Sequence, residues 1–190
     1  MKKIIVIGSG GHARSCVDVI KSLKEYKFAG YIDNRSTNNK IIGTDRDLKK
    51  IFKKIKYAHI GVGQIKSPLK RLKIFNNLKR IGFNLPSIIS PTAIISKSAK
   101  IGEGTIIMHG AILNAYAQVG KNVIINTGTI IDHDTSIHDN CHISTRAIIN
   151  GECLIKKNTF IGSGSVVVNN ITVGKSKFIK AHTLLKKDTL

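Results

Sequence analysis

The stretch INTGTIIDHDTSIHDNCHI, residues 125–143, carries isoleucine at every sixth position. The same spacing continues in both directions, from Ile89 to Leu185, with an aliphatic residue at each step and no insertion. Four residues after each of these positions the side chain is nearly always small or compact, as at Ala111 and Cys141. A period of six fits neither the 3.6-residue turn of a helix nor the alternation of a strand, and it is typical of a parallel β-helix.

Residues 89–190 are therefore predicted to form a prism with three flat faces, in which each aliphatic side chain points inward and stacks on its equivalent one coil away. Three hexapeptides make one coil, so the repeat accounts for five coils and part of a sixth. Residues 1–88 are long enough for a second compact unit with its own core. We expect two domains, divided after residue 88.

Composition narrows the class of protein. The net charge is +20, and the first 88 residues hold 20 basic but only 5 acidic side chains. Most of this excess is lysine, spread over the chain with few aromatic neighbours, so we favour a solvated surface and anionic small ligands over nucleic acid. The three cysteines, Cys16, Cys141 and Cys153, lack metal-ligand spacing and are expected to be buried thiols.

Targeting signals are weak. The apolar run after Met1-Lys2-Lys3 stops after four residues at Gly8, and no apolar run approaches the ~20 residues that cross a bilayer. We expect a cytoplasmic protein without a membrane span.

The first domain opens with a glycine-rich turn between a strand and a helix. Residues 2–7 are a short apolar run, followed by Gly8-Ser9-Gly10-Gly11-His12-Ala13 and then by apolar residues at helical spacing. Such a turn lets the backbone approach a phosphate at a helix N-terminus. A second predicted strand, 28–32, ends in Asp33, which could accept hydrogen bonds from a ribose or base. The domain is too short for a dinucleotide fold, so we expect a single nucleotide.

The rest of the first domain continues this alternation. Thr44 is predicted to cap a short helix, and residues 57–62 to form a third strand that ends at Gly63. Ser67-Pro68 starts a helix that Gly82 ends. Its predicted buried stripe is Leu69, Leu72, Phe75, Leu78 and Ile81. The order strand-helix repeated three times predicts a small Rossmann-like parallel sheet.

Chemistry in the prism is expected where polar residues interrupt the repeat. His133 is followed by Asp134, a base beside a carboxylate that could orient it. Alternatively, both are solvated corner residues. One coil away on either side lie Ala115 and Gly151, whose small size leaves room for a substrate. His142 either binds a ligand or faces a neighbouring subunit.

The other histidines permit two further interpretations. His109 and His138 are interpreted as structural or solvent-facing. Several histidines in one coil also permit zinc between subunits, as in γ-carbonic-anhydrase-type proteins. We rank that hypothesis below catalysis by His133, because it gives no role to Asp134 or to the first domain, and we expect no metal.

Together, the turn Gly8-Ser9-Gly10-Gly11-His12, the strand ending in Asp33, the hexapeptide ladder and the His133-Asp134 pair resemble one family, the NeuD/PglD-like sugar acyltransferases, also called the sialic acid O-acetyltransferase family. The resemblance covers almost the whole chain. It implies a Rossmann-like domain followed by a left-handed β-helix, a homotrimer with active sites between subunits, and transfer of acetyl from acetyl-CoA to a sugar, often the 4-amino group of a nucleotide-linked deoxy sugar.

The resemblance also implies roles for individual residues. The catalytic base is His133, and Asp134 tunes it. The positions along acetyl-CoA are His142, Gly151, Ser163 and Ala181, and those for the nucleotide sugar are Gly8, Gly10, Gly11, His12, Asp33, Asn34 and Gly63. Three alternatives remain at this point: O-acetylation of a sialic acid, a non-enzymatic trimeric scaffold, and a zinc-dependent hydratase.

Overall fold

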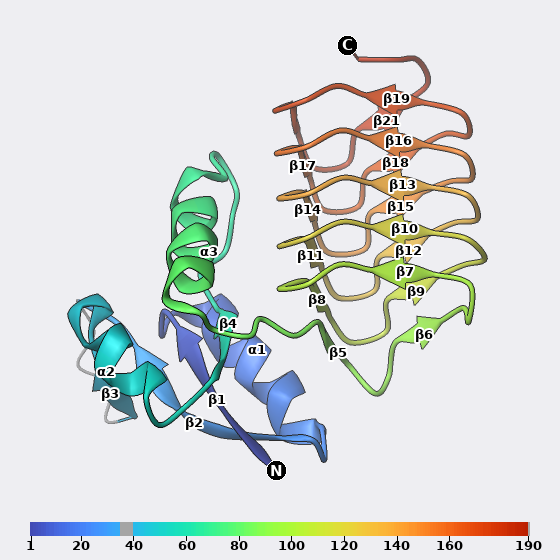
Figure 1. The fold of residues 1–190 in the computed structure, drawn as a ribbon. Coiled ribbons are helices and arrows are strands. Elements are labelled where there is room, and N and C mark those ends of the chain that lie inside the picture. The colour runs from blue at the N-terminus through green and yellow to red at the C-terminus, as the bar shows by residue number, and fades with distance from the viewer. Residues whose placement is uncertain (35–39, 190) are drawn as a thin grey trace.

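The computed structural model describes residues 1–34 and 40–189. The first domain is a four-stranded parallel sheet with strand order β3-β2-β1-β4, covered by helices on both faces (Figure 1). Its elements are β1 (Lys2–Ile7), α1 (Gly11–Ser22), β2 (Tyr26–Ile32), β3 (Ile41–Gly43), the 3₁₀ turn η1 (Asp45–Asp47), α2 (Leu48–Phe52), β4 (Tyr57–Ile60) and α3 (Leu69–Ile81). The predicted Rossmann-like architecture is thus confirmed.

Three details of the first domain differ from the prediction. Strand β3, only three residues long and paired with β2, has too little sequence pattern to be recognised. The third predicted strand ends at Ile60 rather than Val62. In α3, Leu69 is 61% exposed whereas Arg71 is fully buried. The helix contacts both the sheet and the prism, so Arg71, which lies outside the predicted stripe, is buried as well.

The prism consists of two-residue parallel strands arranged in three sheets, and the predicted register is confirmed. The domain-facing sheet holds β5 (Ile88–Ile89), β8 (Ile106–Ile107), β11 (Ile124–Ile125), β14 (His142–Ile143), β17 (Phe160–Ile161) and β20 (Phe178–Ile179). The aliphatic sheet holds β6 (Ile94–Ile95), β9 (Ile112–Leu113), β12 (Ile130–Ile131), β15 (Ile148–Ile149), β18 (Val166–Val167) and β21 (Leu184–Leu185). The polar sheet holds β7 (Lys100–Ile101), β10 (Gln118–Val119), β13 (Ser136–Ile137), β16 (Leu154–Ile155) and β19 (Thr172–Val173). The proposed domain boundary falls within β5.

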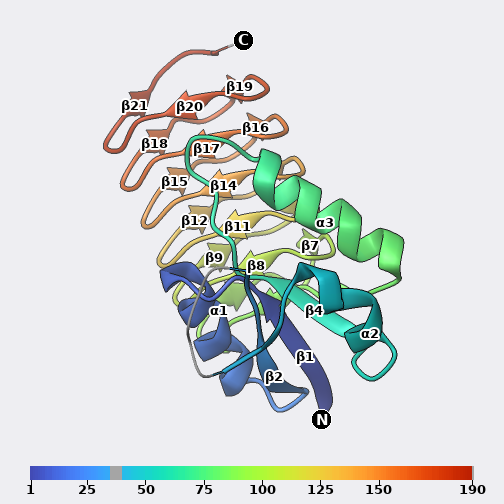
Figure 2. The ribbon, with the colours of Figure 1, turned by 90° about the vertical axis from the view of Figure 1, so that its left-hand side faces the viewer.

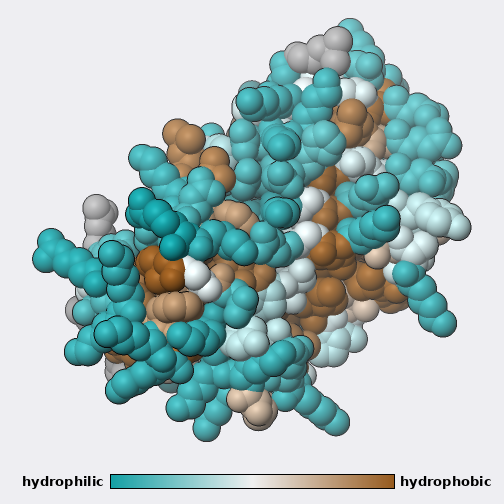
Figure 3. Space-filling model, viewed as in Figure 1, coloured by the Kyte–Doolittle hydropathy of each residue, from teal (hydrophilic) through white to brown (hydrophobic). Residues whose placement is uncertain are grey.

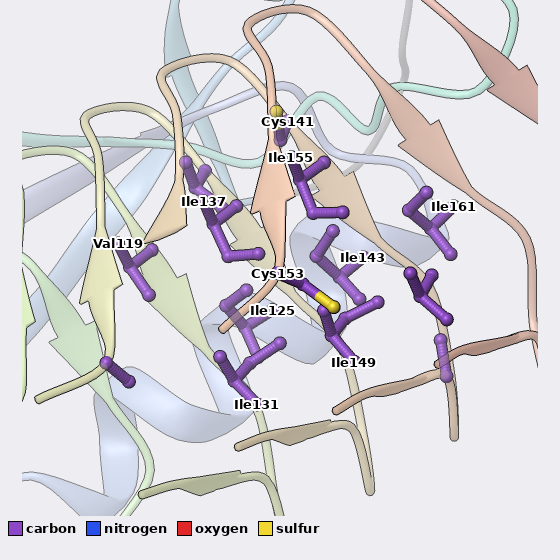
Figure 4. Packing of buried hydrophobic residues seen from close by; sticks show 14 of the residues in the cluster. Val119, Ile125, Ile131, Ile137, Cys141, Ile143, Ile149, Cys153, Ile155 and Ile161 are labelled. Atoms are coloured by element: carbon purple, nitrogen blue, oxygen red, sulfur yellow. The ribbon is translucent and has the colours of Figure 1, made fainter. Parts of the chain in front are cut away.

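The inward ladder forms the core of the prism. Side chains from all three sheets point toward one another, with Ile131, Ile143 and Ile155 fully buried (Figure 4). Polar members of the ladder are satisfied internally, since Thr135 Oγ1 donates to the carbonyl of Asn150 at 2.8 Å. Cys16, Cys141 and Cys153 are all buried free thiols, as predicted.

The outward positions of the three sheets differ in chemistry. On the domain-facing sheet Ile88, Ile106 and Ile124 are buried in one cluster with residues of β1 and α1. On the polar sheet the outward residues are Lys100, Gln118, Ser136, Leu154 and Thr172. On the aliphatic sheet they are Ile94, Ile112, Ile130, Ile148, Val166 and Leu184, of which Ile94 is 64% and Leu184 54% exposed. One face of the prism is therefore covered by the first domain, and a second is aliphatic along its whole length.

Arg71 fastens the two domains together. Its guanidinium donates to the carbonyls of Ile60 and Val62 in the first domain, at 2.6 and 2.9 Å, and to those of Gly104 and Asn122 in the prism, both at 3.4 Å. Figure 2 shows α1 and α3 on either side of this junction. Because both domains contribute to these contacts and to a shared apolar cluster, their relative placement is fixed by packing.

Hydrophilic side chains cover most of the visible face of the first domain (Figure 3). Within the described part of the chain, no helix has the length and apolar character needed to cross a bilayer.

Candidate active site

The glycine-rich turn leaves an open approach to the N-terminus of α1. Gly8 has a φ of 90° and lies close to Val62, so backbone conformation and packing both demand glycine there. Gly10 differs, because its φ of −71° suits any residue and a methyl group added to it would have no neighbour within 4 Å. Neither backbone conformation nor packing within the chain therefore requires a glycine at position 10.

Asp33 braces this turn. Its Oδ2 accepts hydrogen bonds from the backbone N–H of Ser9 at 2.9 Å and from the Ser9 hydroxyl at 2.8 Å. The contact joins the end of β2 to the turn after β1, at the carboxyl edge of the sheet where ligands bind in open α/β folds. The structure thus brings together two segments that the sequence singled out separately.

A pocket of about 390 Å³ opens beside the turn. Its walls are formed by Ile7, Gly8, Ile32, Asp33, Asn34, Asp45, Val62, Lys70 and Ile74. Asp45 and Lys70 were not predicted, because they lie on different elements and gain significance only from the fold. Asn34 uses its side-chain amide to bond Asp45, with Nδ2 donating to Oδ2 at 2.7 Å.

His12 and Gly63 lie beside the turn but do not line this pocket. The His12 ring is within 3.5 Å of Cys16 Sγ, and a methyl group at Gly63 would make ordinary contact with it at 3.7 Å. Burial, reinforced by the charges of Arg71 and His142, lowers the pKa of His12 to about 3. His12 is therefore a neutral hydrogen-bonding group and supplies no positive charge to a phosphate.

His133 and Asp134 form the predicted pair at the corner between β12 and β13. His133 Nδ1 lies 2.9 Å from Asp134 Oδ2, and the two side chains are 47% and 53% exposed. The carboxylate bond raises the pKa of His133. With Nδ1 donating to Asp134, Nε2 keeps its lone pair and can accept a proton, as a general base requires.

Two residues that the sequence reading missed hold this corner in shape. Asp132 Oδ1 accepts bonds from the backbone N–H of His133 at 2.8 Å and from Asn114 Nδ2 at 2.7 Å. Asn114 lies eighteen residues before Asp132, one coil away. Their equivalent positions in consecutive coils are the sequence signal that could have identified this contact.

Gly151 lies directly against the His133 ring. A methyl group at position 151 would be 2.5 Å from Nε2 and 2.6 Å from Cε1. Such distances are inside van der Waals contact, so any side chain there would displace the imidazole. Gly151 therefore makes room for His133, whereas the sequence predicted that its small size would leave room for a substrate.

His142 lies on the domain-facing sheet and is buried. Its Nδ1 bonds the carbonyl of Gln64, Asn126 Nδ2 lies 3.3 Å from its Nε2, and its ring packs edge-on against Phe160. Burial lowers its pKa to about 4, with Arg71 adding to the effect. The sequence predicted that His142 binds a ligand or faces a neighbouring subunit. In the structure it bonds the first domain of its own chain. Gln64 and Asn126 were missed by sequence reasoning.

Ser163 and Ala181 lie at successive corners between the domain-facing and aliphatic sheets, one coil apart. Ser163 Oγ is 2.9 Å from Ser144 Oγ, and Ala181 is exposed. This edge runs from His142 toward the C-terminal coils, and its small residues leave the backbone accessible to an extended ligand.

Within one chain the pocket and His133 are far apart. The first domain packs on the domain-facing sheet, whereas the β12–β13 corner joins the other two sheets and projects from the opposite side of the prism (Figure 1). The structure thus forms both the pocket beside the glycine-rich turn and the His133-Asp134 pair, but it does not bring them together within one chain. Over residues 1–34 and 40–189, no three histidine, cysteine or acidic side chains converge as metal ligands.

Comparison with known proteins assigns this architecture. Residues 3–78 match the family model of the PglD N-terminal domain. The acetyltransferase domain of PglB from Neisseria gonorrhoeae, solved with acetyl coenzyme A, superposes with a TM-score of 0.92 and 30% identity over 98% of this chain and 92% of that one. The chain belongs to the PglD-like sugar acyltransferase family.

Two further proteins are similar to this PglD-like chain. Perosamine N-acetyltransferase from Caulobacter crescentus, solved with CoA and GDP-perosamine, has a TM-score of 0.91 and 25% identity over 99% of this chain and 90% of that one. UDP-N-acetylbacillosamine N-acetyltransferase from Bacillus subtilis is 31% identical over 125 residues, which span 57% of this chain and about half (52%) of that relative. The comparisons establish the left-handed sense of the β-helix, which the sequence implied only by resemblance.

The packing of Gly151 under His133 can be tested by stability. Gly151→Ala is expected to lower Tm by about 2–8 °C, because the new methyl group overlaps the imidazole. In a His133→Ala background the same substitution has room and should change Tm little. Thermal unfolding of wild type, the two single variants and the double variant measures this coupling, and additive effects would contradict it.

The Asp134 contact can be tested by titration. Because the carboxylate raises the pKa of His133, Asp134→Asn is expected to lower it, so that the imidazole loses its proton at a lower pH than in wild type. NMR titration of the His133 ring measures the shift, with Asp188→Asn, at the far end of the prism, as the control. An unchanged His133 titration in Asp134→Asn would show that the pair does not persist in solution.

Proposed function

We propose that this protein is an acetyl-CoA-dependent N-acetyltransferase that acts on the amino group of a UDP- or GDP-linked 4-amino deoxy sugar in bacterial surface glycan biosynthesis. The observation that carries the proposal is the His133-Asp134 pair, in which Nδ1 bonds the carboxylate and the imidazole is about half exposed. The relatives named above support it, since they are N-acetyltransferases of nucleotide sugars or were solved with CoA or acetyl-CoA.

The proposed reaction is direct transfer. The sugar amine attacks the thioester carbonyl carbon while His133 Nε2 accepts the amine proton, and the carbon–sulfur bond then breaks to release the coenzyme thiolate. The proton passes from the imidazolium to this thiolate, which regenerates the base. Asp134 stabilises the imidazolium through Nδ1.

A covalent acetyl-enzyme is not required. Burial raises the pKa of the Cys16 and Cys141 thiols to about 12, so neither provides a thiolate near neutral pH. Cys153 is also buried, and its pKa is raised for the same reason.

The two substrates would bind to different parts of the chain. The pocket beside Gly8 and Asp33 suits the nucleotide, with Gly10 giving a phosphate access to the N-terminus of α1. The edge that carries Ser163 and Ala181 suits the coenzyme, whose pantetheine arm would lie along exposed backbone N–H and carbonyl groups.

We further propose that the protein is a cytoplasmic homotrimer whose active sites lie between subunits. The support is geometric, because the nucleotide pocket and His133 of one chain lie on opposite sides of the prism. A second chain must therefore contribute one of them. The exposed row from Ile94 to Leu184 on the aliphatic sheet is the face that association would bury.

Activity can be tested directly. Thiol release from acetyl-CoA is expected with UDP- or GDP-linked 4-amino sugars, and His133→Ala should reduce kcat by a factor on the order of 10²–10⁴. The panel includes free and CMP-activated sialic acid as competing acceptors. Turnover of sialic acid alone would reassign the protein to O-acetylation, and no release with any acceptor would overturn the enzyme hypothesis.

Shared active sites can be tested by complementation. His133→Ala removes the base, and Gly10→Glu places a carboxylate where a phosphate would bind, at a position where an added Cβ has no neighbour within 4 Å. Each variant alone should be inactive. If each site combines His133 of one subunit with the pocket of another, random mixing in equal amounts should restore about a quarter of wild-type activity. No recovery in trimers shown to be mixed would contradict sites between subunits.

A further inference from the structure

Tyr116 adopts a backbone conformation that is unfavourable for its side chain. Its φ is 59°, in the left-handed region, and its ring is 64% exposed. Left-handed corners recur in every coil, and along the edge beside α3 they are occupied by Asn122, Asn140 and Asn158, whose short side chains tolerate this conformation. Longer polar side chains also occupy such corners, at Arg146, Glu152 and His182, but within the described residues Tyr116 is the only tyrosine, phenylalanine or tryptophan that does.

Tyr116 lies directly next to the catalytic corner. It stands eighteen residues before Asp134, in the equivalent position of the preceding coil, where β-helix coils are about 4.8 Å apart. The backbone N–H of Asp134 donates to the carbonyl of Ala115 at 3.0 Å, so the turn that carries His133 rests on the turn that carries Tyr116. The neighbouring Ala115 is small and exposed, so it leaves space above the ring for a ligand.

The position of Tyr116 along the prism indicates which substrate it would meet. The first domain, with the nucleotide pocket, packs against the early coils through Ile88, Ile106 and Ile124. The coenzyme edge with Ser163 and Ala181 lies in the late coils. Tyr116 precedes His133 by one coil, on the side away from Ser163 and Ala181, so the acceptor rather than the coenzyme is the substrate within its reach.

We propose that Tyr116 is a sugar-binding residue, whose ring packs against the C–H face of the pyranose that presents its amine to His133. Aromatic rings suit this face because it is apolar, and a ring fixed by a turn holds it with little loss of side-chain freedom. This inference rests on the proposed function and assigns the acceptor contact within it.

The test uses the residue that the chain itself places at equivalent corners. Tyr116→Asn is expected to raise KM for the nucleotide-linked amino sugar roughly 3- to 10-fold, with KM for acetyl-CoA unchanged. Binding of UDP or GDP without the sugar, measured by titration, should also be unchanged, because those contacts lie in the first domain. Tyr116→Phe should retain wild-type KM, since packing on a C–H face needs the ring and not the hydroxyl.

Stability separates this role from a structural one. Asparagine relieves the left-handed strain, so Tyr116→Asn is expected to have a Tm at or above that of wild type. A lower Tm, or loss of the trimer in gel filtration, would assign the ring to packing between subunits and overturn the proposal. Unchanged KM for the sugar in an active enzyme would also overturn it, whereas absence of turnover in wild type would instead refute the proposed function.

Discussion

The coil of eighteen residues is the constraint on which this structure depends. Because the repeat runs from Ile89 to Leu185 without insertion, every residue lies over its equivalent one coil away. The turn of His133 is bonded on both sides by this stacking: Asp134 N–H donates to the carbonyl of Ala115, and Glu152 N–H donates to the carbonyl of His133, both at 3.0 Å. One inserted residue would shift every later side chain relative to the coils below it. The position of the imidazole is therefore fixed by the prism as a whole.

A buried cation, Arg71, is one of the contacts that hold the domain junction. Arg71 is fully buried, and dehydration lowers its pKa to about 10, which still leaves it charged at neutral pH. Backbone carbonyls from both domains solvate this charge, and charge-assisted bonds of this kind are stronger than neutral ones. The same cation adds to burial in lowering the pKa of His12, His59 and His142, so these imidazoles remain neutral.

Sequence reasoning was strongest where one local pattern determines structure. The six-residue period predicted the ladder, its register and the burial of Cys141 and Cys153, because each position in a β-helix has one environment. His133 and Asp134 are adjacent in the sequence, so their interaction could also be predicted, since both side chains lie at one corner. Strand β3 was missed because three residues carry no period.

The remaining misses all concern contacts between elements. Arg71 could not be singled out from the sequence, and only its contacts with both the sheet and the prism explain its burial. The partners of His142 were equally hidden, because Gln64 lies seventy-eight residues away and reaches it through the domain junction. The separation of the nucleotide pocket from His133 could not be seen from sequence either, since it depends on which face of the prism the first domain covers.

The His133-Asp134 pair follows from the geometry of an ordinary corner. In an extended strand, consecutive side chains point to opposite faces, so a histidine and the next residue cannot bond. At the β-helix corner the second residue is left-handed, with a φ of 56° at Asp134, and its carboxylate turns back to His133 Nδ1. Asp tolerates this conformation, as do the asparagines at other corners. The same left-handed backbone therefore carries asparagine at positions 122 and 140 and an acid at Asp134. A histidine-carboxylate pair can arise by substitution at a corner, without a change of fold.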